Sequence, residues 1–127
     1  MGTRCLIGVY IPENESVVAS YCNYDGYISH TGALLNKFYN DVEKATAIAN
    51  IGYASSLYDT YAETFEAAAH KGIEPKVFSS VKDYLKGGDF DGAEYLYLFD
   101  GEAWFVSNLY GSDHRFEAVE NFFGKSA

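Results

Sequence analysis

The residues best suited to chemistry in this sequence are a large set of aromatic rings and two isolated arginines. Twelve tyrosines, nine phenylalanines and one tryptophan stand among 127 residues, whereas the arginines are only Arg4 and Arg115. Tyrosine buries a large area with little loss of entropy and keeps one polar tip, which suits interfaces and base stacking. An equal alternative is a tyrosine-rich core with its hydroxyl groups at the rim. Each arginine could hold a phosphate through paired hydrogen bonds or be an ordinary exposed charge.

Patterns typical of catalysis or metal binding do not occur in the sequence. The histidines, His30, His70 and His114, are far apart and lack a paired metal-ligand spacing. Neither glycine-rich phosphate-binding motif is present. Cys22 lies eight residues before His30, so a thiol–imidazole pair is conceivable, but the strand pattern places Cys22 in a packed hairpin. We therefore predict no catalytic residue, no metal site and no cofactor.

The two cysteines have a defined geometric relation. If residues 4–11 and 17–24 form a hairpin, Cys5 and Cys22 face each other across it. Directly opposed residues lie within about 5.5 Å of each other, Cα to Cα, which a disulfide can bridge. In a reducing cytosol the thiols should instead stay reduced and pack as small hydrophobic groups. The sequence leaves both states open.

The net charge of the chain is −9, from 18 acidic and nine basic residues. Lysine and arginine do not cluster, so direct binding of nucleic acid in a basic groove is not expected. The acidity indicates either ordinary solubility or a surface that imitates nucleic acid and occupies a basic groove of another protein. No apolar run approaches the roughly 20 residues that span a bilayer, and the first residues show no signal-peptide pattern. We therefore expect a cytosolic protein that binds no membrane.

Turn residues between β-rich runs predict two hairpins that would position these side chains. The first joins "TRCLIGVYI" (3–11) to "VVASYCNY" (17–24) through a polar cluster. The second joins "AEYLYLF" (93–99) to "AWFVSN" (103–108) through an Asp-Gly pair, which is a strong short-range hairpin signal. The run "AEYLYLF" is apolar at successive positions, so we expect it to be covered on both faces. Residues 76–78 predict a further short strand.

Five segments show helical spacing together with helix-start signals. They are a short segment after Thr31, its expected cap, and residues 41–52, 61–72, 81–87 and 115–125. Asn40 and Glu43 are expected to form a capping box before the second helix, with Val42 on its inward face. Thr60 with Glu63 is expected to cap the helix at 61–72, and Ser80 with Asp83 the helix at 81–87. Residues 21–35 are interpreted as a strand end, an Asp-Gly turn and a helix start. The predicted fold class is α+β, a single domain (1–127) with an antiparallel sheet of two hairpins and several helices packed on it.

The stretches "TRCLIG", "YCNYDGYISHTGALLNKFYND", "ANIGYASSL" and "YLYLFDGEAWFVS" look like those of a group of small bacteriophage and prophage proteins. The match covers residues 3–58 and 93–108. The usual form of this group has a segment similar to Y-C-H-W-D-G-Y-P-S-H-V-G. This chain departs from it at Asn23, Tyr24 and Ile28, where histidine, tryptophan and proline are usual. A catalytic histidine at position 23 is therefore excluded.

The resemblance implies a non-enzymatic phage counter-defence protein that acts in the host cytoplasm. One type that it resembles sequesters a nucleotide signal of host immunity, such as a cyclic nucleotide or a cyclic ADP-ribose isomer, usually as a homo-oligomer. For such a ligand the expected binding residues are Tyr24, Tyr27 and Trp104 for stacking, His30 for hydrogen bonding, and Arg4 and Arg115 for phosphate. Two alternatives stay open. One is an acidic inhibitor of a host defence protein such as a CRISPR or restriction nuclease, and the other is a structural or replication-accessory protein.

Overall fold

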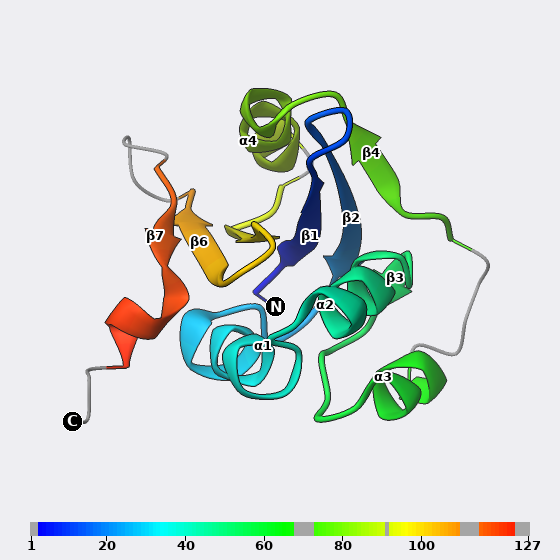
Figure 1. The fold of residues 1–127 in the computed structure, drawn as a ribbon. Helices are drawn as coiled ribbons and strands as arrows, with labels where there is room; N and C mark the ends of the chain where they lie inside the picture. Colours follow the sequence, from blue (N-terminus) through cyan, green and yellow to red (C-terminus); the bar gives the residue numbers. More distant parts are fainter. Residues whose placement is uncertain (1–2, 68–72, 91, 110–114, 124–127) are drawn as a thin grey trace.

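The computed structural model of this chain describes residues 3–67, 73–90, 92–109 and 115–123. Its centre is a seven-stranded sheet in the order β3-β2-β1-β5-β6-β7, with β4 also paired to β2. The strands are β1 (Cys5–Ile11), β2 (Ser16–Cys22), β3 (Tyr53–Ala54), β4 (Lys76–Phe78), β5 (Tyr95–Phe99), β6 (Trp104–Asn108) and β7 (Glu117–Ala118). Helices lie on both sides of the long strands (Figure 1). The fold is therefore α+β, as predicted.

Both hairpins expected from the turn signals are present. β1 and β2 pair antiparallel with Cys5 opposite Cys22, which is the predicted register. β5 and β6 also pair antiparallel, with Phe99 opposite Trp104. The turn between them contains Gly101, whose φ of 108° is a conformation that side chains other than glycine rarely adopt. Local turn chemistry thus sets the pairing inside each hairpin.

The prediction of a purely antiparallel sheet is wrong, because the sheet is mixed. β1 pairs parallel with β5, which places Cys5 opposite Tyr95 and Val9 opposite Phe99. β2 likewise pairs parallel with β3. The two hairpins therefore join through their first strands, and parallel neighbours need a long crossover connection, which the intervening helices provide. β1 and β5 become central strands covered on both faces, in agreement with the continuous apolar sequence of β5.

The helices form a layer on each face of the sheet (Figure 1). The π-helical turn η1 (Ile28–Gly32), α1 (Ala33–Phe38) and α2 (Val42–Ala49) cover one face, and α4 (Val81–Phe90) covers the other. α3 (Tyr61–Ala67) lies next to α2. Residues 68–72 of the helix predicted at 61–72 lie outside the described residues.

Helix starts follow the expected capping chemistry in part. The hydroxyls of Thr60 and Ser80 accept hydrogen bonds from backbone N–H groups in the first turns of α3 and α4, as predicted. Asp41 caps α2 in place of Asn40, and its carboxylate accepts from a backbone N–H of the first turn at 2.8 Å. Val42 does not face inward as expected. It lies in that first turn and is 57% exposed.

The helix expected at 115–125 is wrong for the residues that the structure describes. β7 extends the sheet there, with Ala118 opposite Phe105 and Glu117 opposite Val106, and the 3₁₀ helix η2 (Val119–Phe122) follows. Apolar residues three and four positions apart fit a helix. The pairing of residues 117–118 with β6, however, satisfies backbone N–H and C=O groups that the outer edge of β6 would otherwise leave exposed.

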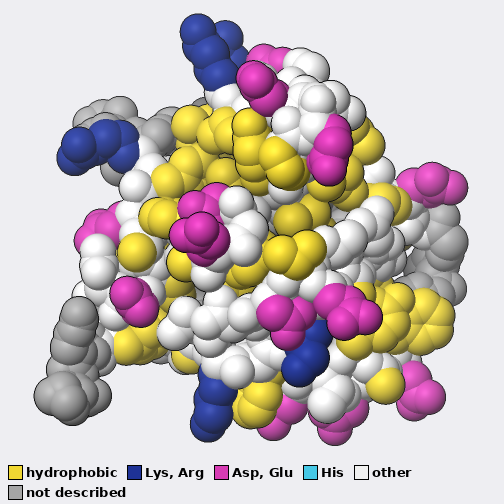
Figure 2. Space-filling view, in the orientation of Figure 1, with side chains coloured by type: hydrophobic (Ala, Val, Ile, Leu, Met, Phe, Trp, Pro, Cys, Tyr) yellow, Lys and Arg dark blue, Asp and Glu magenta, His cyan; other side chains and the backbone are white. Residues whose placement is uncertain are grey.

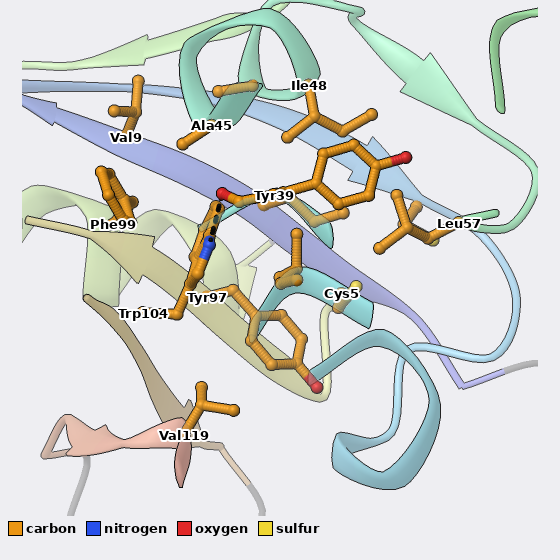
Figure 3. Close-up of a cluster of buried hydrophobic side chains, with 14 of the residues drawn as sticks. Cys5, Val9, Tyr39, Ala45, Ile48, Leu57, Tyr97, Phe99, Trp104 and Val119 are labelled. Carbon is orange, nitrogen blue, oxygen red and sulfur yellow. Dashed lines mark hydrogen bonds between the residues drawn. The ribbon is translucent and has the colours of Figure 1, made fainter. Parts of the chain in front are cut away.

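The core has one part on each face of the sheet, and the hydroxyl of Tyr84 links the two. Trp104, Tyr97 and Phe99 are buried on the face that α1 and α2 cover (Figure 3). On the other face Tyr84 is fully buried, and its hydroxyl donates to the backbone oxygen of Tyr97 at 2.7 Å. A Cβ at Gly8 would lie 2.9 Å from that hydroxyl oxygen, so a larger residue would push Tyr84 away. Burial raises the pKa of Tyr84 well above its ordinary value, which keeps the hydroxyl protonated as a donor.

Candidate ligand-binding site

Residues 21–35 form the corner expected from the sequence, where β2 ends and helical structure begins. Asp25 has a φ of 60°, a left-handed conformation that aspartate tolerates better than most residues. The N–H of Gly26 donates to the backbone oxygen of Thr3 at 2.8 Å, and its carbonyl accepts from the Tyr97 hydroxyl at 2.7 Å. A Cβ on Gly26 would lie 2.8 Å from the same Thr3 oxygen. The corner is therefore held close to the end of β1, and glycine is required there.

Thr31 does not cap a helix at this corner, contrary to the prediction. Helical structure begins earlier, at Ile28, as the π-helical turn η1, so Thr31 lies inside it. The Thr31 hydroxyl instead donates to the backbone oxygen of Asp25 at 2.7 Å and ties the turn to the helix. π-helical turns are rare and are frequent at functional sites. The side chains around η1 are therefore natural candidates for a binding surface.

Three of the predicted site residues, Tyr24, Tyr27 and His30, lie at this corner. Tyr24 is 49% exposed and Tyr27 is 40% exposed, and the Tyr27 ring centroid lies 6.0 Å from that of His30. Nε2 of His30 lies 3.1 Å from the backbone oxygen of Leu57, so this nitrogen carries the proton and donates it. None of the three rings lines either of the cavities described below. They form an exposed patch at the surface.

Cys5 and Cys22 are opposed across β1 and β2, and both are free and fully buried thiols. The Cys22 thiol donates to the backbone oxygen of Tyr24 at 3.4 Å. Burial raises the pKa of the Cys5 thiol well above its ordinary value, and its hydrogen bond with Cys22 raises it further. A buried thiol with a raised pKa is a poor nucleophile. The pair therefore packs as small hydrophobic groups beneath the corner.

Trp104 was expected to stack on a ligand, but its side chain belongs to the core. It is 1% exposed, and its indole N–H donates to the backbone oxygen of Tyr39 at 3.0 Å (Figure 3). Its ring packs against that of Phe99 with the centroids 5.2 Å apart. Alternation along β6 turns Trp104 toward the face that α1 and α2 cover. This burial leaves no ring face for a ligand, so we do not include Trp104 in the site.

Arg4 is exposed just before β1 and lies among residues of the face that α4 covers. Its backbone N–H donates to the Glu94 carboxylate at 2.6 Å. Burial raises the pKa of Tyr21, and the nearby Arg4 guanidinium offsets part of that rise. The Tyr21 ring stacks on that of Tyr53, with the centroids 6.2 Å apart. Arg4 therefore accompanies a tyrosine pair and lines neither of the cavities described here.

Arg115, by contrast, lines a cavity of about 480 Å³ at the outer edge of the sheet. The described residues around it are Val106, Asn108, Arg115, Phe116, Glu117 and Phe122. Val106 and Glu117 are opposite each other on β6 and β7. Asn108 lies two positions further along β6, and Arg115 lies two positions before β7 begins. The volume falls in the range of small-ligand pockets, about 300–1,000 Å³.

Asn108, Phe116 and Phe122 line this cavity although their sequence pattern did not predict a site there. The expected helix at 115–125 assigned Phe116 to a helix face, whereas Phe116 packs on Tyr84 with their ring centroids 6.4 Å apart. Phe122 is the last residue of η2, and its side chain is 46% exposed. The alternation of polar and apolar residues in Arg-Phe-Glu-Ala (115–118) is the pattern that could have indicated a strand.

Two further features limit the chemistry of the described residues. They contain no group of three or more histidine, cysteine, aspartate or glutamate side chains placed to hold a metal ion. His30 lies among them, whereas His70 and His114 lie outside the described residues. None of the helices in the described part of the chain has the length and apolar character needed to cross a membrane.

No protein-family model, curated protein or solved structure matches this chain.

Proposed function

We propose that this protein is a non-enzymatic binding protein that holds a nucleotide-type ligand in the cavity beside β6, β7 and η2. The observation that carries the proposal is that Arg115, Asn108 and the rings of Phe116 and Phe122 line one cavity of about 480 Å³. Arginine binds phosphate through charge-assisted hydrogen bonds, asparagine can bond to a base edge, and an aromatic ring can stack on a base. A nucleotide offers all three partners in one molecule.

The carboxylate of Glu117, which lines the same cavity, narrows the orientation of the ligand. A carboxylate repels a phosphate at close range and accepts hydrogen bonds from hydroxyl and amino groups. The ligand should therefore direct its phosphate toward Arg115 and its ribose hydroxyls or an amino group toward Glu117. Since the whole chain carries a charge of −9, long-range attraction does not favour an anion, and affinity depends on these local contacts.

The resemblance to small phage proteins supports a biological role for such binding. In this proposal the ligand is a nucleotide signal of host immunity, a cyclic nucleotide or a cyclic ADP-ribose isomer, and the protein sequesters it in the host cytoplasm. Sequestration requires tight binding and no bond cleavage, so it needs only the contacts that the cavity offers. By the same resemblance we propose that the protein acts as a homo-oligomer.

Thermal melting against a panel of mono-, di- and cyclic nucleotides, including cyclic ADP-ribose isomers, tests this function. A ligand at about 100 times its dissociation constant should stabilise the protein by roughly 2.7 kcal/mol, which is several degrees of Tm for a domain of this size. A shift with one nucleotide class supports the proposal. A panel without any shift refutes tight nucleotide binding.

Two arginine variants then test the position of the site. Arg115→Ala should weaken binding about tenfold to a hundredfold, since a hydrogen bond to a charged group contributes about 1.5–3 kcal/mol. Arg4→Ala is the matched control, because it removes the same charge from a residue outside the cavity, and it should change affinity less than about twofold. Equal losses in the two variants would mean that the ligand binds elsewhere.

A third variant tests the orientation of the ligand. Glu117→Gln keeps the size of the side chain and removes its charge, so the affinity should fall several-fold if the carboxylate accepts hydrogen bonds from the ligand, as the proposed orientation requires. A several-fold gain in affinity would instead place a phosphate beside Glu117 and refute this orientation. Isothermal titration with the nucleotide found in the panel measures both outcomes.

A further inference from the structure

A second surface, separate from the Arg115 cavity, lies around α3 and exposes aromatic side chains. We define it as the α3 surface, made of Tyr58, Tyr61 and Phe65, which are 42%, 40% and 44% exposed. The rings of Tyr61 and Phe65 stack with their centroids 6.0 Å apart. Thr64 is the buried residue of this helix among those described, so the helix turns its large apolar side chains outward. Figure 2 shows hydrophobic side chains gathered over α3, with acidic side chains at their margin.

A cavity of about 260 Å³ adjoins the α3 surface and shares Tyr61 with it. Its walls come from the end of α1, from α2 and from the segment before α3, and the described residues that line it are Phe38, Tyr39, Lys44, Ala47, Asp59, Thr60 and Tyr61. The volume lies below the range of about 300–1,000 Å³ that is usual for whole small ligands. A cavity of this size, with aromatic walls, suits one apolar side chain that a partner inserts as an anchor.

The electrostatic character of this region is negative. Residues 37–67 contain five acidic residues and two lysines. Burial raises the pKa of the Tyr39 hydroxyl, and the charges of Asp59 and Glu63 raise it further. The negative charges of both carboxylates therefore reach Tyr39, which lines the cavity. At this end of the cavity they favour a cationic group and disfavour an anionic one. Asp59 itself lines the cavity, together with one cation, Lys44.

We propose that the α3 surface and its cavity bind a protein segment in which one large apolar side chain is flanked by lysine or arginine. The apolar side chain enters the cavity, and the rings of Tyr58, Tyr61 and Phe65 cover it from solvent. The flanking cations face the carboxylates of Asp59 and Glu63. An anchor in a desolvated pocket surrounded by weaker contacts is the usual arrangement of a strong protein–protein contact. This inference does not depend on nucleotide binding at Arg115.

Two short peptides serve as probes of this proposal, acetylated and amidated Lys-Lys-Trp-Lys-Lys and Glu-Glu-Trp-Glu-Glu. Each is titrated into ¹⁵N-labelled protein while amide chemical shifts are recorded. The cationic peptide should shift amides within 38–47 and 58–66, and the acidic peptide should not bind there. Raising the salt from about 50 to about 300 mM should weaken the cationic peptide several-fold, because the Debye length shortens from about 14 Å to about 6 Å.

A pair of tryptophan variants provides the decisive control. Ala47→Trp places a large ring on a residue that lines the cavity, and it should weaken the cationic peptide at least about tenfold by occupying the anchor position. Ala62→Trp adds the same ring to an exposed residue of α3 that is not among those lining the cavity, and it should change affinity less than about twofold. Circular dichroism checks that both variants fold.

The proposal is wrong if the cationic peptide does not bind, if the two peptides give equal shift maps, or if Ala47→Trp leaves the affinity of the cationic peptide unchanged. Shifts spread over acidic residues across the whole molecule would also overturn it, because they would indicate non-specific attraction to a chain of net charge −9.

Discussion

The hydrogen bond from Tyr97 to the corner should contribute a large share of the stability of residues 21–35. The Tyr97 side chain is fully buried, and its hydroxyl donates to the Gly26 carbonyl at 2.7 Å. Tyr97→Phe keeps the ring and removes the donor, so the carbonyl is left buried without this partner. A lost hydrogen bond that strands a buried acceptor costs about 1–3 kcal/mol, and we expect about 2 kcal/mol. Unfolding entropy is about 2.1 cal/mol/K per residue, so for 127 residues this loss lowers Tm by about 7 °C.

Urea denaturation and calorimetry of the two matched variants Tyr97→Phe and Tyr27→Phe measure this contribution. Tyr27 belongs to the same corner but is 40% exposed, so its hydroxyl exchanges freely with water and its loss should cost less than about 0.5 kcal/mol. If Tyr97→Phe loses no more stability than Tyr27→Phe, the Gly26 carbonyl finds another partner. The hydrogen bond from Tyr97 to Gly26 would then not hold the corner in place.

Alkaline pH should destabilise the fold, because burial raises the pKa of folded Cys5 whereas the unfolded thiol releases its proton near pH 8.5. The contribution of Cys5 to the free energy of unfolding is then fully present below about pH 8.5, and above it the free energy of unfolding falls by up to about 1.4 kcal/mol per pH unit. Cys5→Ala should flatten this slope in urea denaturation at rising pH. An equally steep slope in the variant would contradict the assignment. Gly52→Ala should destabilise more than Gly101→Ala, although both glycines have a positive φ, because a Cβ at Gly52 would lie 1.9 Å from the backbone oxygen of Ile73 and Gly101 has no atom within 4 Å. We expect about 1 kcal/mol for Gly101→Ala and several for Gly52→Ala, and equal losses of Tm would refute this reading. Trp104→Phe should cost about 2–3 kcal/mol in denaturant unfolding through the lost indole hydrogen bond and the space it leaves. A loss below about 0.5 kcal/mol would show that the Trp104 side chain is not buried and tightly packed in the core.

The sequence predicted those parts of the fold that depend on contacts within a short stretch of chain. The turn between the first two strands set the register that opposes Cys5 and Cys22. The Asp-Gly pair at 100–101 set the hairpin of β5 and β6. Capping by Thr60 and Ser80 was likewise predictable from the sequence, because a cap involves residues only three positions apart.

Features that depend on distant partners could not be read in this way. The parallel pairing of β1 with β5 is decided by which edges remain unpaired once each hairpin has formed, and no local pattern contains that information. The same limit explains residues 115–118, where an open strand edge outweighs helical spacing. It also explains why the burial of Trp104 was not predicted, since a large aromatic ring suits both stacking on a ligand and packing in a core.

Arg115 shows that a candidate residue can be identified while its surroundings are not. The sequence left two roles open for Arg115, a phosphate ligand and an ordinary exposed charge, and it did not give the neighbours of Arg115 in space. Asn108 reaches the cavity from β6, so only the strand pairing places it beside Arg115. The other five predicted residues are distributed between the corner, the start of β1 and the core.

The parallel pairing of β1 with β5 has a consequence for synthesis on the ribosome. Tyr95 is the partner of Cys5, so 90 residues separate the two positions that must meet in the middle of the sheet. β2 is complete at Cys22 and β5 begins at Tyr95. At about 5–20 residues per second, the finished first hairpin therefore waits roughly 4–15 s with the edge of β1 unpaired before β5 is made. Pairing over such a separation also slows folding of the finished chain, since loop closure precedes the contacts that reward it. During this interval the nascent hairpin is the segment most exposed to aggregation and to capture by chaperones.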